Sequence, residues 1–338
     1  QCTAVSDIDP ARAQARAKEF DIPRVLTPDE LIKDKDIDIV LNLTIPAAHA
    51  EVNLKALEAG KHAFTEKPFA TSVADAKKVL ETAKKKNLLV GCAPDTVLGG
   101  GTQTCRKLID EGLIGDVIGA TAFMASHGPE SWHPDPEFFY QPGGGPMLDM
   151  GPYYLSSLVQ LVGPIKKISA ITKASFAERT VGSGAKAGKK IKVEVPTHYS
   201  GQALFENGAV ATLVMSFDVW AAKLPRIEIY GTKGSLSVPD PNTFGGPIFY
   251  FDPSFKDWVE MKLVLGFQEN ARGLGLADMA QAVRDKRAHR ASGDMAAHVL
   301  EAMLSFEESS KQGKPIELSI PCKRPDAMKA GEILSTLK

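Results

Sequence analysis

The first 93 residues alternate between short apolar runs and helix-forming stretches, and this alternation constrains the fold more than any other feature. Residues 37–43 form an apolar run rich in β-branched residues and leucine, which is typical of a buried parallel strand. A helix is expected over 47–59, because Gly60 can end it, and a second strand-like run follows at 62–65. A helix over 72–86 and a strand over 88–92 continue the pattern. Strands that alternate with helices predict a parallel sheet.

Residues 2–7 resemble a further strand that ends in an acid, Asp7. Asp9 and Pro10 supply an N-cap and a first helical position for a helix that runs to about Phe20. A strand, an acid and a helix in this order are typical of the second βα unit of a dinucleotide-binding fold, whose first unit carries G-x-G-x-x-G. No such fingerprint precedes Asp7. We therefore expect an N-terminally truncated Rossmann-type domain with residue 1 on an interior strand, and whether such a chain binds cofactor stays open here.

The second half of the chain is rich in predicted β-strands. They are expected at 165–172, 198–205, 210–217, 226–230 and 235–238, with a hairpin turn at Asn207-Gly208. Helices return at 276–285 and 294–312. We predict an incomplete dinucleotide-binding domain over 1–94 and an α+β domain over 95–338 with a large, mostly antiparallel open sheet. The uncovered face of such a sheet favours a homo-oligomer, a dimer or a tetramer.

Composition excludes several classes of function. The net charge of −1 among 338 residues gives no field that would attract nucleic acid. No apolar run approaches the roughly 20 residues that span a bilayer, so no membrane partner is expected. The four cysteines have no C-x-x-C spacing, which indicates reduced thiols in a cytoplasmic protein. The seven histidines do not cluster with acids or cysteines, so no metal site is expected.

Two motifs carry the candidate chemistry, Glu66-Lys67-Pro68 and residues 143–153. Lys67 follows a strand, and ligands of open α/β sheets bind beyond the carboxyl ends of strands. Pro152 would clash deep inside a helix, so the helix is expected to begin near Asp149, with Tyr153 one turn later. Asp149 at a helix start would accept a substrate hydroxyl. The alternative for Lys67 is an exposed lysine at the end of a strand. The alternatives for Asp149 and Tyr153 are a helix cap and a core aromatic residue.

Oxidation of an alcohol needs a hydride acceptor and a group that takes the hydroxyl proton. A free phenol, with a pKa of about 10, is a poor base at neutral pH, but an adjacent ammonium favours the phenolate. Lys67 is the candidate for that charge and Tyr153 for the phenol, with Tyr154 as the alternative one residue on.

The ordered set of motifs resembles the Gfo/Idh/MocA oxidoreductase family. The matching segments are Val5-Ser6-Asp7, 43–46 with His49, 59–62, 66–68, 143–153, 195–198 and 229–234. Most members carry histidine where this chain has Tyr153. The segment 149–153 instead resembles the tyrosine branch typified by glucose–fructose oxidoreductase and dimeric dihydrodiol dehydrogenase, which implies Tyr153 as catalytic acid/base beside Lys67.

The cofactor residues follow from the fold and the resemblance. Asp7 is expected to bind the adenosine ribose, which favours NAD, although Arg12 could reach the 2′-phosphate of NADP. The resemblance implies that Thr44, Ile45, His49 and Glu66 line the nicotinamide half of the groove, together with Lys67. For His49 a purely structural role on its helix is an equal alternative.

The substrate residues are expected in two places. Trp132 and His133 open a proline-rich aromatic loop, 132–140, that could stack on a sugar or simply pack on the sheet. Asp95, just past the last predicted strand of the first domain, is a further candidate. We interpret the chain as an NAD(P)-dependent dehydrogenase of a sugar, sugar derivative or cyclic polyol. The alternatives are an NAD-dependent glycosidase that oxidises its substrate transiently and a non-catalytic dinucleotide or sugar sensor.

Overall fold

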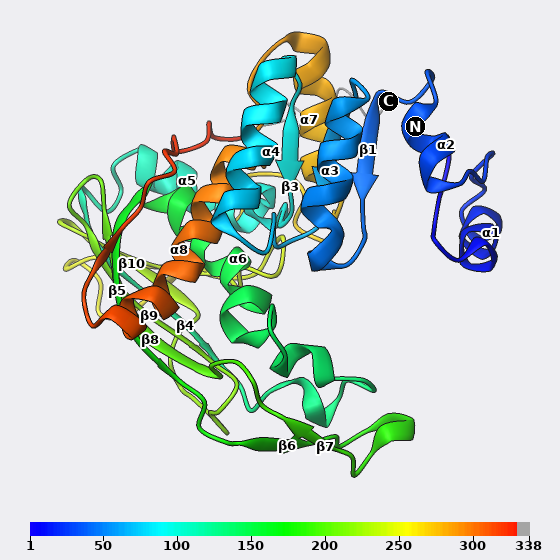
Figure 1. The fold of residues 1–338 in the computed structure, drawn as a ribbon. Helices are drawn as coiled ribbons and strands as arrows, with labels where there is room; N and C mark the ends of the chain where they lie inside the picture. The colour runs from blue at the N-terminus through cyan, green and yellow to red at the C-terminus, as the bar shows by residue number, and fades with distance from the viewer. Residues whose placement is uncertain (330–338) are drawn as a thin grey trace.

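A computed structural model describes residues 1–329 and contains a small parallel sheet next to a large mixed one (Figure 1). The parallel sheet has the order β1 (Ile39–Asn42), β2 (His62–Thr65) and β3 (Val90–Cys92). Helix α3 (His49–Glu58) connects β1 to β2, and α4 (Val73–Lys86), capped by Ser72, connects β2 to β3. The parallel arrangement confirms the prediction from the alternating pattern.

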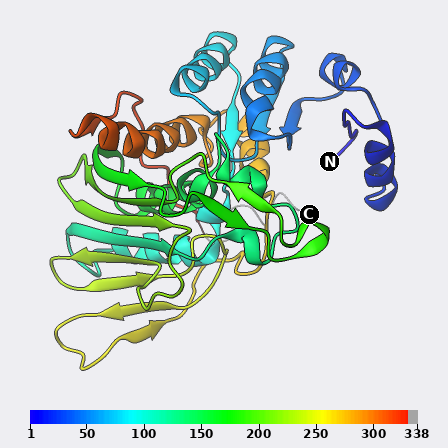
Figure 2. The same cartoon turned by 60° about the horizontal axis from the view of Figure 1, so that its bottom comes forward.

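The expectation that residue 1 lies on an interior strand is wrong. Residues 2–7 form no strand; Val5 makes a single parallel bridge to Val25, where the Val5 amide donates to Arg24 and the Leu26 amide to Val5. Helices α1 (Pro10–Glu19) and α2 (Pro28–Lys33) follow residues 2–7 in the chain. This N-terminal part lies beyond β1 in both views (Figures 1 and 2). The single bridge therefore joins residues 2–7 to Val25 and not to β1.

The large sheet has nine strands in the order β13-β12-β11-β10-β4-β9-β8-β5-β14, and Figure 2 shows them fanning out beneath the helices. Among its pairs only β4 and β9 are parallel. Gly208, with φ of 89°, makes the predicted turn between β8 and β9. The strands are β4 (Val117–Ala125), β5 (Ile165–Lys173), β8 (His198–Phe205), β9 (Val210–Ser216), β10 (Ile227–Gly231), β11 (Ser235–Val238), β12 (Ile248–Phe251), β13 (Val259–Met261) and β14 (Ile316–Glu317). This architecture confirms the predicted fold class.

Four further helices follow β3 in the described part of the chain: α5 (Gly100–Asp110), α6 (Gly145–Leu161), α7 (Leu274–Asp285) and α8 (Gly293–Gln312). Helix α8 packs on β5, α4 and α6, and Ser292 before it bridges to Gly91 of β3 (Figure 1). The chain therefore returns to the parallel sheet near its end. The predicted division of the chain into domains 1–94 and 95–338 stays a prediction. The last nine residues of the predicted second domain, 330–338, lie outside the described part.

Short elements complete the chain. Strands β6 (Glu178–Thr180) and β7 (Lys190–Lys192) form a hairpin, and the loop between them is rich in glycine and lysine. The 3₁₀ turns are Pro46–Ala48, Thr96–Leu98, Pro129–Ser131, Glu137–Tyr140 and Gly184–Lys186. All four cysteines are free. Among residues 1–329 no helix is long and apolar enough to cross a bilayer.

Helix α6 begins earlier than expected. It starts at Gly145, so Asp149 lies past the first turn and Pro152 lies inside the helix. An interior proline costs roughly 3 kcal/mol because it removes one hydrogen bond and crowds the preceding turn. Every residue from 151 to 161 is buried, and each large apolar side chain there contributes about 1.5–3 kcal/mol. Burial therefore outweighs the cost of the proline.

Candidate active site

Lys67 and Asp149 form the centre of the candidate site. The Lys67 Nζ donates to Asp149 Oδ1 at 2.9 Å and to the Asp149 carbonyl oxygen at 2.7 Å. That carbonyl lies next to the gap that Pro152 leaves in the helical bonding pattern, since Pro152 cannot donate to Leu148. The counter-charge of Asp149 is thus the lysine ammonium and not the start of α6. The structure joins the two predicted motifs although 82 residues separate them.

Tyr153 shares this place, whereas Tyr154 does not. The Lys67 Nζ lies 5.4 Å from the centroid of the Tyr153 ring. The Tyr154 hydroxyl instead accepts a long 3.4 Å hydrogen bond from Arg226, and burial raises the pKa of Tyr154 to about 12. Successive helical residues point about 100° apart, so only one of the two can face the lysine. The geometry therefore favours Tyr153 as the phenol beside the ammonium.

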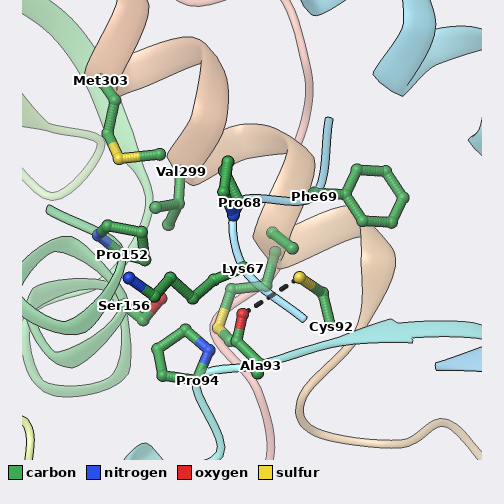
Figure 3. A pocket seen from close by; sticks show the side chains of 12 residues that line it. Lys67, Pro68, Phe69, Cys92, Ala93, Pro94, Pro152, Ser156, Val299 and Met303 are labelled. Atoms are coloured by element: carbon green, nitrogen blue, oxygen red, sulfur yellow. Dashed lines mark hydrogen bonds between the residues drawn. The ribbon is translucent and has the colours of Figure 1, made fainter. Parts of the chain in front are cut away.

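A small cavity borders Lys67 on its apolar side. Figure 3 shows the lysine side chain running past Pro94 toward Pro152 and Ser156, with Val299 and Met303 of α8 nearby. The remaining lining residues are Pro68, Phe69, Cys92, Ala93, Met295 and Ala296. The lysine stem therefore crosses apolar surroundings, and its charged end alone meets polar atoms.

The residues predicted for the nicotinamide half divide into exposed and buried ones. Thr44 and Ile45 are exposed just past the carboxyl end of β1, and Glu66 follows β2 with its carboxylate accepting from the Lys67 amide at 3.1 Å. His49 is buried, and its ring nitrogens lie 2.7 Å from the Pro68 carbonyl oxygen and 2.9 Å from that of Thr44. Both ring nitrogens lie within hydrogen-bond distance of backbone carbonyl oxygens, which favours the structural alternative, and the contact of His49 with a cofactor stays a prediction.

Asp7 lies at the start of the chain's first helical unit. Its Oδ1 accepts from the Asp9 amide at 2.8 Å and from Arg12 Nη2 at 3.1 Å. The carboxylate is partly exposed and the guanidinium more so. One surface thus presents both the acid expected to accept from a ribose and the cation that could meet a 2′-phosphate.

Asp95 is buried and bonded to the start of α7. It is 3% exposed, and its Oδ2 accepts from the amides of Gly273 at 2.7 Å and Gly275 at 3.1 Å. It therefore caps the start of α7, because the first amides of a helix lack partners within the helix. These bonds give Asp95 a structural role, and its contact with substrate stays a prediction.

The aromatic loop precedes α6 directly, as predicted. Trp132 is 66% exposed, and the His133 ring packs edge-on against Phe138 and Phe139 with centroids 5.5 and 5.4 Å apart. A buried ion pair of Arg179 with Glu130, at 2.9 Å, anchors the base of the loop. No interaction in residues 1–329 joins Trp132 or His133 to Lys67, so their contact with substrate stays a prediction.

Sequence reasoning missed Arg272. Its guanidinium carbon lies 5.9 Å from the centroid of the Tyr153 ring. The signal was present in Arg272-Gly273-Leu274-Gly275, where closely spaced glycines precede a predicted helix as they do before α6.

The arrangement can perform proton transfer beside a bound ring. A phenol, an ammonium and a carboxylate meet beyond the carboxyl edge of the parallel sheet, where α/β folds bind ligands. Ile45 is exposed and the Asp7 carboxylate is partly exposed, so both side chains are accessible to a ligand. No group of three metal-ligating side chains occurs in residues 1–329.

Comparisons with known proteins agree with this geometry. Residues 1–93 match the model of the oxidoreductase family with an NAD-binding Rossmann fold, and residues 102–237 match the GFO/IDH/MocA C-terminal domain. The dTDP-3,4-didehydro-2,6-dideoxy-alpha-D-glucose 3-reductase of Saccharopolyspora spinosa is 33% identical over 50% of this chain and 51% of its own. The trans-1,2-dihydrobenzene-1,2-diol dehydrogenase of Xenopus tropicalis is 27% identical over 71% of this chain and 67% of its own.

The fold itself is shared with levoglucosan dehydrogenase. Its structure in complex with NADH and levoglucosan matches with a TM-score of 0.78 at 20% identity, over 94% of this chain and 90% of that one. The chain spans about half to two thirds of the length of the curated relatives that it matches. Both family models and the shared fold point the same way: the chain belongs to the GFO/IDH/MocA oxidoreductase family.

Proposed function

We propose that the protein is an NAD(P)-dependent oxidoreductase that transfers a hydride between nicotinamide and a hydroxyl-bearing carbon. The substrate would be a sugar, a sugar derivative or a cyclic polyol. The observation that carries the proposal is the contact of Lys67 with both Asp149 and the Tyr153 ring at the carboxyl edge of the sheet. The names of two relatives, a sugar reductase and a diol dehydrogenase, support the substrate class.

Each of the three residues has a distinct role in this proposal. Nicotinamide, when bound, supplies the hydride acceptor or donor. The Tyr153 hydroxyl exchanges the proton of the substrate hydroxyl, and the Lys67 ammonium stabilises the negative charge that develops on the phenol. Asp149 uses Oδ1 to hold Lys67. Its Oδ2 accepts no hydrogen bond from residues 1–329, so this oxygen is available to orient a substrate hydroxyl.

The proposed cofactor is NAD, with Asp7 on the adenosine ribose and Thr44, Ile45, Glu66 and Lys67 along the nicotinamide half. A carboxylate favours a free 2′-hydroxyl and repels a 2′-phosphate. Arg12 already pairs with Asp7, which leaves less of its charge for NADP. Parallel measurement of Kd for both reduced cofactors tests this preference.

The decisive experiment is a substrate screen with the full-length protein. Sugars, sugar derivatives and cyclic polyols are offered with NAD⁺ or NADP⁺ while the absorbance of the reduced nicotinamide is followed. We expect substrate-dependent reduction that Tyr153→Phe abolishes. Saturable cofactor binding without turnover across the panel would contradict the proposal and favour a sensor, and release of free sugar without net reduction would identify a glycosidase.

We also propose that the protein is a homo-oligomer assembled through the large sheet. Its strands leave apolar side chains exposed at Ile118 of β4, Ile171 of β5 and Val210 of β9. Solvent-exposed apolar side chains on an open sheet are typical of association surfaces. Light scattering coupled to size exclusion should give at least twice the mass of one chain, which is 36.3 kDa for these 338 residues, and Ile171→Lys should lower it.

A further inference from the structure

Two cations flank the ring of the candidate catalytic phenol. Lys67 Nζ lies 5.4 Å and Arg272 Cζ 5.9 Å from the centroid of the Tyr153 ring. Both distances fall within the range in which a cation is attracted to an aromatic face. The lysine is neutralised by Asp149, so the two cations differ in what balances their charge.

Arg272 has no carboxylate partner among residues 1–329. Its Nη2 donates a hydrogen bond to the neutral amide oxygen of Asn242 at 2.9 Å. The acid nearest in that loop, Asp240, faces Arg226 at 3.6 Å. A guanidinium has five N–H donors, so most of those of Arg272 remain available beside Tyr153.

The backbone that carries Arg272 is rigidly held. Buried Asp95 accepts from Gly273 and Gly275, and the amide of Arg272 itself donates to Asn270 Oδ1 at 3.4 Å. A Cβ on Gly275 would lie 2.8 Å from the Asp95 Cβ and 2.9 Å from the Phe64 ring, so the start of α7 presses against β2. The guanidinium is therefore presented from a fixed point at the carboxyl edge of the parallel sheet.

We propose that Arg272 binds an anionic group of the substrate, a carboxylate or a phosphate, and so selects charged sugars over neutral ones. The planar fork of a guanidinium matches these oxyanions with two parallel hydrogen bonds. Asp149 is already engaged by Lys67, so an incoming anion does not compete with an internal partner for Arg272. This inference rests on the proposed function, because it names the substrate class of the same site.

The test compares matched pairs of probes on the full-length protein. Glucose, glucuronate and glucose 6-phosphate share one ring and differ in charge. The ratio of kcat/KM for each anion to that for glucose is measured in the wild type, Arg272→Gln, Arg272→Lys and the control Arg284→Gln. Arg284 is exposed near the other end of α7, so its variant removes the same charge away from the site.

We expect Arg272→Gln to lower the anion-to-neutral ratio about 10- to 100-fold, as is typical for loss of a hydrogen-bonded charge. Arg272→Lys should restore part of it, and Arg284→Gln should leave it unchanged. Comparison of glucuronate with glucose 6-phosphate shows whether the Arg272 guanidinium prefers a carboxylate or a phosphate. An unchanged ratio in Arg272→Gln overturns the inference while the proposed function stands.

A binding measurement distinguishes failure of the Arg272 inference from failure of the proposed oxidoreductase function. Calorimetric titration of the same three probes in the presence of NADH needs no turnover. If no probe is turned over but an anion binds more tightly than glucose, and only with Arg272 intact, the inference stands and the proposed function fails. If no anion binds the wild type more tightly than glucose, the inference is overturned.

Discussion

Replacement of Lys67 by methionine is the sharpest test of the proposed chemistry. Methionine keeps a flexible apolar stem for the surroundings that Figure 3 shows and removes the charge. Charge developing on the Tyr153 ring, 5.4 Å from the ammonium, would gain about 3 kcal/mol at an effective dielectric constant of about 20. Asp149, 2.9 Å from the same nitrogen, opposes part of that gain. We therefore expect kcat to fall about 10- to 100-fold.

Two companion variants separate the charge from its framework. Lys55→Met removes a lysine that pairs with Glu51 at 2.7 Å on the exposed face of α3, and it should leave kcat unchanged. Asp149→Asn frees the ammonium of its partner, so a double-mutant cycle with Lys67→Met measures the coupling of the pair. Steady-state kcat by nicotinamide absorbance and thermal melting are recorded for each variant.

Two outcomes bear on the proposed role of the Lys67 ammonium. If Lys67→Met retains kcat within threefold of the wild type, with an unchanged melting temperature, the ammonium does not assist proton transfer. A loss of kcat in Lys55→Met of the same size would show that the assay reports general damage instead.

Three further outcomes are expected. Tyr153→Phe should lower kcat at least 100-fold with the fold intact, whereas Tyr154→Phe should leave kcat within a few-fold in the same assay. Asp95→Ala should lower the free energy of unfolding by about 1–2 kcal/mol in urea titrations, because two amides at the start of α7 lose their acceptor. Burial lowers the pKa of His289 from 6.5 to about 4, so the unfolded chain binds more protons between these values. The free energy of unfolding should therefore fall by about 3 kcal/mol as pH drops from 6.5 to 4, and His289→Gln should flatten that part of the profile.

Local patterns in the sequence predicted the regular elements well. The predicted β8 has the bounds His198–Phe205 in the structure, and its turn to β9 lies at Asn207-Gly208. Helix α4 begins after Ser72, whose side chain caps it, and α8 ends at Gly313 in a left-handed conformation. Caps and turns depend on a few neighbouring residues, which is why the sequence reveals them.

Long-range packing explains what the local sequence did not reveal. Residues 2–7 have the composition of a strand, but a strand needs a neighbour along its length, and Val5 pairs only with Val25. Asp95 and His49 are polar residues at strand and helix ends, where ligand contacts are common. Their partners, Gly273 in one case and Pro68 in the other, lie 178 and 19 residues away, and no local pattern shows that these partners satisfy them.

The candidate site shows both what local motifs reveal and what long-range packing conceals. Lys67, Tyr153 and Arg272 come from three segments, and the first two were found because each sits in a motif with a chemical reason for its spacing. Arg272 lies beside the same ring, and we attribute this placement to Asp95, which bonds to the start of α7 directly after it. A buried carboxylate that looked like a ligand contact thus acts one step away from the ligand, by placing the guanidinium that would make the contact. Asp95→Ala and Arg272→Gln should therefore both lower selectivity for anionic sugars, but only Asp95→Ala should also lower stability.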